Sequence, residues 1–326
     1  MNRSNVETLE PLLHEHWGIR PTRIEALSSG HTNKTYLVED AARRAVLRVS
    51  WPGKSTAQVW REAWVLDGLG ATPNLPALPR LRPTLAAQPF VNTPEGRWLH
   101  LFEHIDGSPG LPRDAESGAV DAMRTLACLH AALAVLATIP ASASGPLAWI
   151  EQRYARVAAR PAPPLSAGLR ECYEPLLRRI GEQLAAARAW MTGSARWLHG
   201  DYHAGNLLFV GRTVSGVLDF DDVGQGSHEL EAAFALFALS RDTTVEDHFA
   251  FDVRLWDAGL SAYAAPGTGD VPRWMSANRD ALRDLFCAEQ TLIHLEAAQR
   301  GLWTPGPGMG FLACLRQLRA GVSSGR

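Results

Sequence analysis

The sequence predicts an α+β protein with a small β-rich N-terminal part and a larger, mainly helical C-terminal part. Short apolar runs bounded by turn residues gather in the first hundred residues. Long alanine- and leucine-rich stretches with helical spacing fill most of the chain after residue 114. Between them, residues 106–110 read Asp-Gly-Ser-Pro-Gly, which is typical of a linker. The expected division is therefore 1–103, a linker or hinge over 104–110, and 111–326.

The composition narrows the class of protein. Of the 326 residues, 46% are hydrophobic and 20% are charged, as in ordinary globular proteins. A net charge of −2 argues against a dedicated nucleic-acid binder. No apolar run approaches the roughly 20 residues that cross a membrane, and the four cysteines form no C-x-x-C pair. We therefore expect a cytoplasmic protein without nucleic-acid or membrane partners, either a monomer or a homodimer.

In the N-terminal part we expect two helices and a sheet. Residues 5–17 have the spacing of a short amphipathic helix, and Ser55–Leu69 carries apolar side chains at helical spacing. The proline-rich residues 73–83 are expected to form a loop. Strands are expected at Ile24–Leu27, Thr35–Val38, Ala45–Val49, Gln88–Val91 and Trp98–Glu103.

The C-terminal part is expected to be helical around one β segment. That segment, residues 196–220, contains a hairpin, because apolar runs flank the turn Gly211-Arg212-Thr213. Residues 160–166 are rich in proline and are expected to form a loop. Helices are expected at 114–139, 167–192, 227–240, 245–264, 273–300 and 308–322.

The hairpin collects the residues with the clearest chemical signal. If its two strands pair across the turn, Asn206 lies beside Asp219 at the open end, and Asp201 lies on the loop just before. Carboxylate and carboxamide oxygens are ligands that suit Mg²⁺ with bound phosphates. A separate carboxylate can take the proton of a hydroxyl nucleophile.

The spacing of these three residues, D-x-x-x-x-N and then D, matches phosphotransferases with a protein-kinase-like fold. With H-G-D at 199–201 and L-D-F-D at 218–221, the chain resembles the aminoglycoside phosphotransferase family, which includes homoserine, choline and methylthioribose kinases. The resemblance implies a bilobal protein-kinase-like fold whose catalytic loop spans 199–222. It also implies transfer of the γ-phosphoryl of ATP to a hydroxyl, with Asp201 as catalytic base and with Asn206 and Asp219 holding Mg²⁺.

The N-terminal part carries matching motifs. Leu27–Val38 resembles the family's short phosphate loop, in which Ser29 and Gly30 would touch the β-phosphate. Arg48, in A-V-L-R-V, stands where most kinases have the lysine that clamps the α- and β-phosphates; arginine can fill that role bidentately. Glu62, 14 residues further on, matches the helix glutamate that pairs with this cation.

Two further matches concern the hinge and the catalytic loop. Residues 102–107 resemble the hinge, where backbone groups of Glu103 and Ile105 would bind the adenine edge. Glu229 stands where the family usually has an aspartate that braces the catalytic loop. If Arg48 is not the clamp, the only two lysines of the chain, Lys34 and Lys54, are the replacements.

The acceptor is expected to be a small, amino-bearing molecule with a hydroxyl group. Residues 201–326 contain 16 acidic residues and 10 arginines, and such a surplus favours a cationic substrate: an aminoglycoside, homoserine or a choline-like alcohol. Two kinase-like alternatives remain, a protein Ser/Thr kinase of the bacterial stress-response type and a catalytically idle nucleotide-binding pseudokinase. A third is a zinc hydrolase using His199, Asp201 and His203 with Asp219, which leaves the Asn206 spacing and the β-rich part unused.

Overall fold

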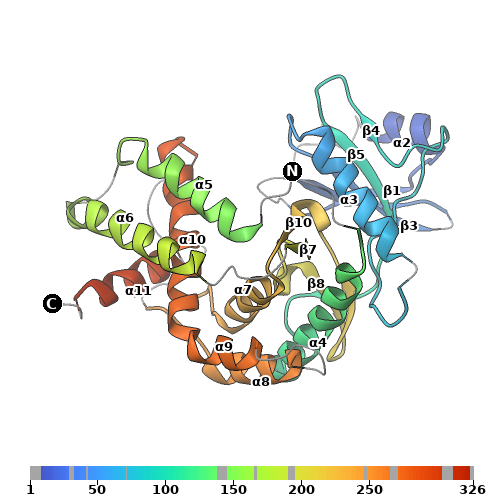
Figure 1. Cartoon of the computed structure of the whole chain (residues 1–326). Coiled ribbons are helices and arrows are strands. Elements are labelled where there is room, and N and C mark those ends of the chain that lie inside the picture. The colour runs from blue at the N-terminus through green and yellow to red at the C-terminus, as the bar shows by residue number, and fades with distance from the viewer. Residues whose placement is uncertain are drawn as a thin grey trace. The chain divides into compact units, whose positions relative to one another are not determined.

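A computed structural model describes residues 9–28, 33–41, 43–70, 72–137, 145–164, 167–189, 195–245, 248–264, 271–302 and 311–323. The chain folds as two compact units (Figure 1). The smaller unit is Met1–Ser108 together with Ser215–Val223, and the larger unit is Pro109–Val214 together with Gly224–Arg326. The first boundary falls inside the expected linker. The segment Ser215–Val223, however, belongs to the smaller unit, although its sequence position places it in the C-terminal part.

The smaller unit is built on a five-stranded antiparallel sheet with the order β1-β2-β3-β5-β4. Its strands are β1 (Arg23–Ser28), β2 (Lys34–Glu39), β3 (Arg44–Val49), β4 (Val91–Asn92) and β5 (Trp98–Glu103). Four of them lie where the sequence predicts them, and β5 has the predicted bounds. β4 is shorter and begins later than expected, because Gln88 instead closes a turn with Thr84 and Pro89 has no N–H to donate to a ladder.

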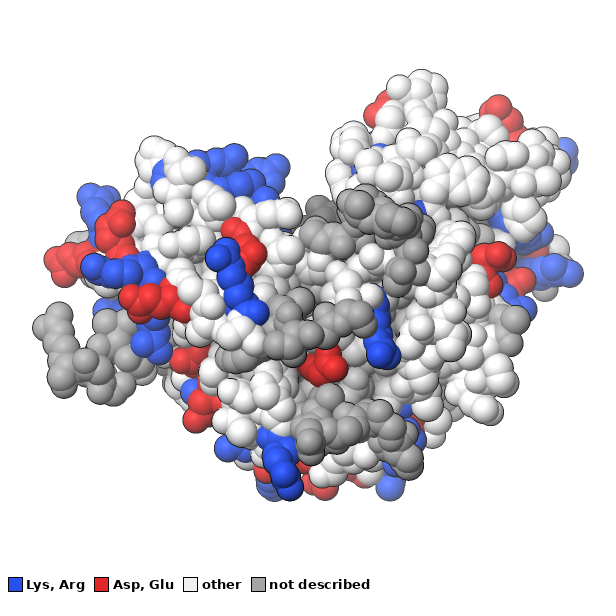
Figure 2. Space-filling view, viewed as in Figure 1, with Lys and Arg blue, Asp and Glu red and all other residues white. Residues whose placement is uncertain are grey.

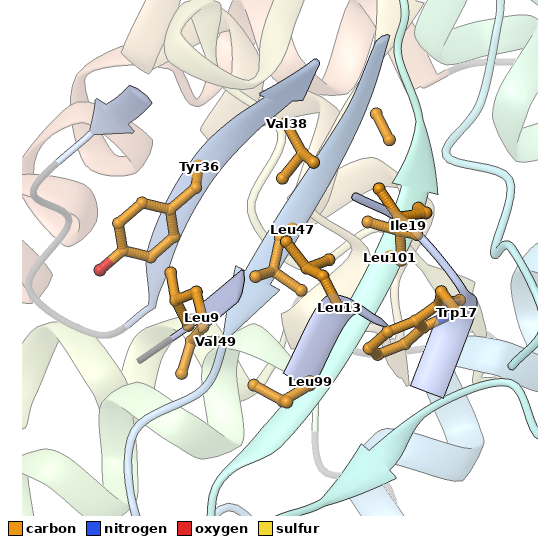
Figure 3. Packing of buried hydrophobic residues seen from close by; sticks show 11 residues of the cluster. Leu9, Leu13, Trp17, Ile19, Tyr36, Val38, Leu47, Val49, Leu99 and Leu101 are labelled. Atoms are coloured by element: carbon orange, nitrogen blue, oxygen red, sulfur yellow. The ribbon is translucent and has the colours of Figure 1, made fainter. Parts of the chain in front are cut away.

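Helix α2 (Leu9–Trp17) covers one face of this sheet (Figure 3). Its buried residues Leu9, Leu13 and Trp17 are four residues apart and share one side of the helix. They pack against strand residues that alternate along each strand, including Leu47 and Leu101. Because alternate side chains point to opposite faces, the residues between them, such as Arg48, point to the face that α2 does not cover.

Helix α3 (Thr56–Leu69) begins at a capping box. The hydroxyl of Ser55 accepts the backbone N–H of Gln58, and the Gln58 side chain accepts the N–H of Ser55. The buried side of the helix carries Val59, Val65, Leu66 and Leu69, and Glu62 lies among them. A carboxylate in such apolar surroundings requires a cationic partner.

The larger unit is mainly helical, as predicted. Its helices are α4 (Ala115–Ala134), α5 (Pro146–Ala158), α6 (Ala167–Arg188), α7 (His228–Ser240), α8 (Val253–Tyr263), α9 (Val271–Ala277), α10 (Arg279–Gln299) and α11 (Phe311–Ser323). None of the described helices is long and apolar enough to cross a membrane. The fold class predicted from the sequence is confirmed.

Several short strands and single turns lie outside the five-stranded sheet and the helices. β7 (Arg196–Leu198) pairs antiparallel with β10 (Gly224–Gly226). A three-stranded sheet has the order β6 (Ser108–Pro109), β8 (Leu207–Val210) and β9 (Thr213–Val217). Single 3₁₀ turns, η1 (Ala204–Asn206) and η2 (Phe220–Asp222), follow β7 and β9 along the chain.

The structure differs from the sequence prediction at three helices. α5 was not expected; it buries only Leu147, Ile150 and Val157, so its apolar pattern is sparse. The helix expected at 245–264 begins at Val253, where the side chain of Asp252 accepts the N–H of Arg254. The helix expected at 273–300 is interrupted at Asn278, whose backbone and side-chain nitrogens both donate to the carbonyl of Trp274 and so end α9.

Leu13→Ala should destabilise the smaller unit by about 2–5 kcal/mol, because it leaves a cavity between α2 and the sheet. Leu13 is 0% exposed. Glu15→Ala, at an exposed position of the same helix, is the matched control. Urea denaturation gives the free energy of unfolding, and hydrogen exchange of β2 and β3 identifies the unit affected. A loss below about 1 kcal/mol for Leu13→Ala would contradict the packing described here.

Candidate functional site in two halves

Arg48 is the centre of a buried charge cluster in the smaller unit. Its guanidinium is 7% exposed and lies over the ring of Phe102, 5.1 Å from the ring centroid. Nη2 donates to Oε2 of Glu62 on α3, and Nη1 donates to Oδ1 of Asp219 at 3.2 Å. The structure therefore brings together Arg48 and Glu62, as the resemblance to kinases implies, and adds Asp219 to the pair.

Electrostatics keep this pair ionised. Burial alone would raise the pKa of Glu62, but the charges of Arg48 and Lys54 outweigh burial and lower it. Burial likewise opposes the charge on Arg48, yet the carboxylates of Glu62 and Asp219 raise the pKa of its guanidinium. Each charge is thus stabilised mainly by the opposite charges beside it, so the cluster depends on its ion pairs.

Lys54 belongs to the same cluster, which the sequence analysis missed except as a replacement clamp. Its Nζ is fully buried and contacts Oδ1 of Asp221 and, at 3.5 Å, Oε2 of Glu62. The other oxygen of Asp221, Oδ2, accepts from the side-chain amide of Asn33 at 3.2 Å. Burial, opposed by Glu62, lowers the pKa of Lys54 to about 8, so the amine stays charged at neutral pH. The sequence feature that could have pointed to Lys54 is the rarity of lysine, since the chain has only two.

Asp219 is the exposed carboxylate of the cluster, with a side chain 40% accessible. Its backbone is left-handed, with φ 60° and ψ 67°, a conformation that aspartate tolerates better than most residues. The chain then enters η2, where Phe220 is fully buried. The left-handed turn at Asp219 therefore lets its own carboxylate face solvent while the next side chain, Phe220, packs inside and anchors the loop.

The hinge residues lie at the end of β5. The N–H of Glu103 donates to the carbonyl of Arg80 at 2.9 Å, so this amide is already used within the smaller unit. Glu103 and Ile105 both line a cavity of about 430 Å³. Ser29 and Gly30, expected at the β-phosphate, lie outside the described residues.

In the larger unit, Asp201 is fixed by its neighbours in the catalytic loop. Asn206 donates its Nδ2 to the carbonyl of Asp201 at 2.8 Å and to Oδ2 at 3.1 Å. The Nε2 of His203 lies 3.3 Å from the same Oδ2, and its Nδ1 accepts the N–H of Gly205 at 3.0 Å. A neutral His203 that carries its proton on Nε2 satisfies both contacts.

The environment of Asp201 keeps it ionised. Burial alone would raise its pKa, but the hydrogen bond with His203, the imidazole of His199 and the amide of Asn206 outweigh burial and lower it. The carboxylate is therefore available to accept a hydrogen bond from a hydroxyl group. Because Asn206 uses its amide nitrogen on Asp201, its Oδ1 is the atom left to act as a ligand.

Glu231, not Glu229, braces the catalytic loop, which corrects the sequence prediction. The Oε2 of Glu231 accepts the N–H of His199 at 3.2 Å, and Oε1 accepts the N–H of Gly200 at 2.6 Å. Gly200 has φ 91°, a conformation that favours glycine. Glu229 instead accepts the hydroxyl of Ser227 at the start of α7. Two residues apart on a helix lie on nearly opposite sides, so only one of the two glutamates can face the loop.

A buried network supports Glu231 from behind. The Nε2 of His130 on α4 donates to Oε2 of Glu231 at 2.7 Å, and the hydroxyl of Tyr263 lies 2.7 Å from Nδ1 of His130. The ring of His228 stacks on that of His130, with centroids 3.9 Å apart. Burial alone would raise the pKa of Glu231, but its contacts with His130 and Gly200 lower it. The loop is therefore tied to α4, α7 and α8.

Two side chains, one in each unit, have the chemistry of ligands for a divalent ion. Asp219 offers a carboxylate and Asn206 a carboxamide oxygen, which are hard ligands that Mg²⁺ accepts together with water and phosphate oxygens. Among the residues that the structure describes, no group of three or more His, Cys, Asp or Glu side chains could hold a metal ion.

Comparison with known proteins identifies the family. The sequence matches the phosphotransferase enzyme family over residues 23–269, about three quarters of the chain. The chain belongs to the phosphotransferase enzyme family. The enzyme class expected from the motifs is thereby confirmed. A search of curated proteins finds no match to the sequence.

Several solved structures share the fold of this chain. An amicoumacin kinase, in complex with AMP-PNP, Ca²⁺ and Ami, is 12% identical, with 99% of this chain and 96% of that chain covered and a TM-score of 0.74. A microcompartment-associated aminopropanol kinase is 18% identical over 98% of both chains, with a TM-score of 0.69. The GDP complex of an aminoglycoside 2′-phosphotransferase is 15% identical over 99% and 98%, with a TM-score of 0.66. At such identities the likeness establishes the shared fold.

Glu231→Gln should loosen the catalytic loop of this phosphotransferase, because glutamine keeps only one acceptor oxygen for two backbone N–H groups. We expect a loss of about 1–3 kcal/mol in stability and faster hydrogen exchange over residues 196–206. Glu229→Gln is the matched control and should change neither quantity appreciably. Equal effects of the two substitutions would contradict the assignment of the brace to Glu231.

Arg48 and Glu62 should be strongly coupled in stability. Arg48→Met or Glu62→Gln alone leaves a buried charge without its main partner and should cost about 3–5 kcal/mol. The double variant should cost less than the sum, with a coupling above roughly 0.5 kcal/mol. The exposed pair Arg44 and Asp106, 2.7 Å apart, is the control cycle and should show a smaller coupling. Urea denaturation measures both cycles, and strict additivity at Arg48 and Glu62 would refute the contact.

Proposed function

We propose that this phosphotransferase moves the γ-phosphoryl of ATP to a hydroxyl group of a small, amino-bearing molecule, with Mg²⁺. The observation that carries the proposal is the state of Asp201. It is ionised, partly exposed, and held by Asn206 and His203 within a loop that Glu231 braces. A fixed carboxylate of this kind is what a hydroxyl nucleophile needs.

Asp201 would orient the acceptor hydroxyl and take its proton. Oδ2 is occupied by Asn206 and His203, so we assign Oδ1 to the acceptor. The proton of the hydroxyl would pass to this carboxylate as the hydroxyl oxygen attacks the γ-phosphorus of ATP, the bond from this phosphorus to the bridging oxygen breaks, and ADP leaves. Phosphoryl transfer needs little covalent help from the protein, so positioning supplies most of the catalysis.

The smaller unit would bind the nucleotide. Nη1 of Arg48 meets the half-exposed Asp219, so we assign this edge of the guanidinium to the α- and β-phosphates, with Glu62 holding the other edge. Ser29 and Gly30 remain the expected contacts of the β-phosphate. At the hinge, the N–H of Glu103 is used by Arg80, so its carbonyl oxygen, together with the backbone of Ile105, is assigned to the adenine edge.

Mg²⁺ would be held by Asn206 and Asp219, where it supplies positive charge against the phosphates. With Mg²⁺ placed there, the other residues keep their proposed roles. Arg48 and Glu62 would position the phosphates, and Asp201 would position the hydroxyl.

The surplus of acidic residues in the larger unit supports an amino-bearing acceptor. The support is weaker than the count of 16 acidic residues against 10 arginines in residues 201–326 implies. Part of the acidic surplus is used in ion pairs: Glu296 with Arg153 and Arg156, and Asp284 with Arg179. Figure 2 shows acidic and basic atoms interleaved over α5 and α6. The similar structures include kinases described for amicoumacin and for aminopropanol. These names favour amino-bearing acceptors over protein substrates.

The alternatives keep weaker support. A stress-response Ser/Thr kinase is favoured only by the wording of residues 199–206. A pseudokinase would not need an ionised Asp201 held by three neighbours. We place the protein in the cytoplasm, because four scattered single cysteines fit a reducing compartment.

An ATP-consumption screen tests the function. Amino alcohols, aminoglycosides and casein are offered with ATP and Mg²⁺, and ADP release is measured with the wild type and with Asp201→Asn. We expect turnover of an amino-bearing small molecule. Asp201→Asn should lower kcat by about 10²–10⁴-fold while nucleotide affinity stays within a few fold, because only the proton acceptor is lost.

Asp242→Asn is the control. It removes one negative charge at an exposed loop position of the same unit. Phosphorylation of casein without any small-molecule turnover would favour the protein-kinase alternative. Full activity of Asp201→Asn would remove this residue from the mechanism.

A further inference from the structure

The smaller unit has another cavity, of about 400 Å³, beside the hinge end of β5. A volume of this size is that of a site for a small organic molecule. All of its lining residues belong to the smaller unit, and the charged or titratable ones are Arg43, Arg44, Arg82, Glu103, His104 and Asp106. The proposed reaction uses none of these side chains, so the cavity requires its own explanation.

The cavity lies on the side of the sheet that α2 covers. Two of its lining residues, Ala45 and Glu103, pair across β3 and β5. Leu47 and Leu101, two residues away in the same strands, belong to the core that packs against α2. Residues two apart in a strand share one face of the sheet, whereas Arg48 lies three positions from Ala45 and points to the other face. The cavity is therefore separate from the guanidinium that we assign to the phosphates of ATP.

Two arginines bring positive charge to this cavity that the protein does not neutralise. In the described part of the chain, no carboxylate pairs with the guanidinium of Arg43 or of Arg82. Their backbones are nevertheless fixed. The N–H of Arg43 donates to Oδ1 of Asp40 at 2.8 Å, and the carbonyl of Arg82 accepts the ring N–H of Trp17 at 3.0 Å. The cavity thus holds two guanidiniums whose N–H groups are available to a ligand.

The remaining groups of the cavity include one available carboxylate. Oδ1 of Asp106 is already used, since it accepts from Nη2 of Arg44 at 2.7 Å and lies 3.4 Å from Nδ1 of His104. Burial and the charge of Arg44 lower the pKa of His104, so its imidazole is neutral near pH 7. The side chain of Glu103 is exposed, and no described cation lies within ion-pair distance of it. Two positive charges and one negative charge are therefore left for a ligand.

We infer that this cavity is a second ligand site, which binds a small phosphate monoester that also carries an amino group. The phosphate meets Arg43 and Arg82, because guanidinium forks bind phosphate oxygens bidentately. The amino group meets Glu103. A doubly charged phosphate thus matches the two arginines and an ammonium matches the carboxylate, whereas a phosphate without an amino group would leave Glu103 beside its negative charge.

The site is independent of the reaction proposed above. That reaction makes compounds of this chemical class, but binding at Arg43, Arg82 and Glu103 requires neither ATP nor turnover. The two sites can therefore be tested separately.

Isothermal titration calorimetry of the full chain with 2-aminoethyl phosphate tests the inference. Inorganic phosphate and ethanolamine are the comparison probes, since each lacks one of the two charged groups. The titrations are made with and without an excess of AMP-PNP and Mg²⁺, which fill the site of the proposed reaction. With AMP-PNP present, we expect 2-aminoethyl phosphate to bind, inorganic phosphate to bind more weakly, and ethanolamine to show no binding at the same concentrations.

Three substitutions assign the contacts. Arg43→Gln and Arg82→Gln should each weaken the binding of both phosphates by about tenfold, the effect of losing a hydrogen bond between charged groups. Glu103→Gln should weaken the binding of 2-aminoethyl phosphate but not that of inorganic phosphate, which loses a repulsive neighbour. Arg160→Gln, at an exposed position of the larger unit, is the matched control for the change of charge and should alter neither affinity by more than about twofold. Circular dichroism verifies that each variant is folded.

Three results would overturn the inference. They are the absence of 2-aminoethyl phosphate binding up to millimolar concentrations, binding that AMP-PNP abolishes, and binding that folded Arg43→Gln and Arg82→Gln leave unchanged. Equal losses for the two phosphates in Glu103→Gln would overturn the assignment of the amino group. Each of these results leaves the proposed phosphoryl transfer intact, because the ATP-consumption screen measures it independently.

Discussion

Charge neutrality inside the smaller unit is the constraint on which its architecture depends. Arg48, Lys54, Glu62 and Asp221 are all nearly inaccessible to water, and an unbalanced charge among them would be strongly destabilising. Each comes from a different stretch of chain: a strand, the loop before α3, α3 itself, and the returning segment Ser215–Val223. Satisfying the four charges therefore fixes four segments against one another, and the position of Asp219 follows from that arrangement.

In the larger unit, one buried carboxylate likewise fixes a loop in place. Glu231 accepts two consecutive backbone N–H groups, those of His199 and Gly200, and is itself supported by His130. The partly exposed Asp201, which follows Gly200 directly, is thus held in place by a buried acid. In both units a buried carboxylate, Glu62 or Glu231, holds partly exposed polar groups in place through protein contacts alone.

Much of this could be predicted from local patterns, and the rest could not for physical reasons. Alternating apolar residues predict β3 and β5, and the resemblance to the phosphotransferase family implies the pair Arg48–Glu62. The contact of Lys54 with Asp221 joins residues 167 positions apart, and no periodicity encodes it. β10 is glycine-rich and becomes a strand only because β7 pairs with it. Glu229 and Glu231 lie on different sides of α7. Which of them faces the loop depends on the residue at which the helix begins.

The return of Ser215–Val223 to the smaller unit has a consequence for biosynthesis. A ribosome completes the five-stranded sheet and α3 long before it reaches Asp219 and Asp221. Until then Arg48 and Lys54 have only Glu62 to share, and the nascent sheet carries surplus positive charge. The N-terminal unit therefore cannot mature first and alone, as N-terminal domains commonly do during synthesis. It reaches its final state only after about two thirds of the chain has emerged, and a fragment ending at the linker would lack part of its own interior.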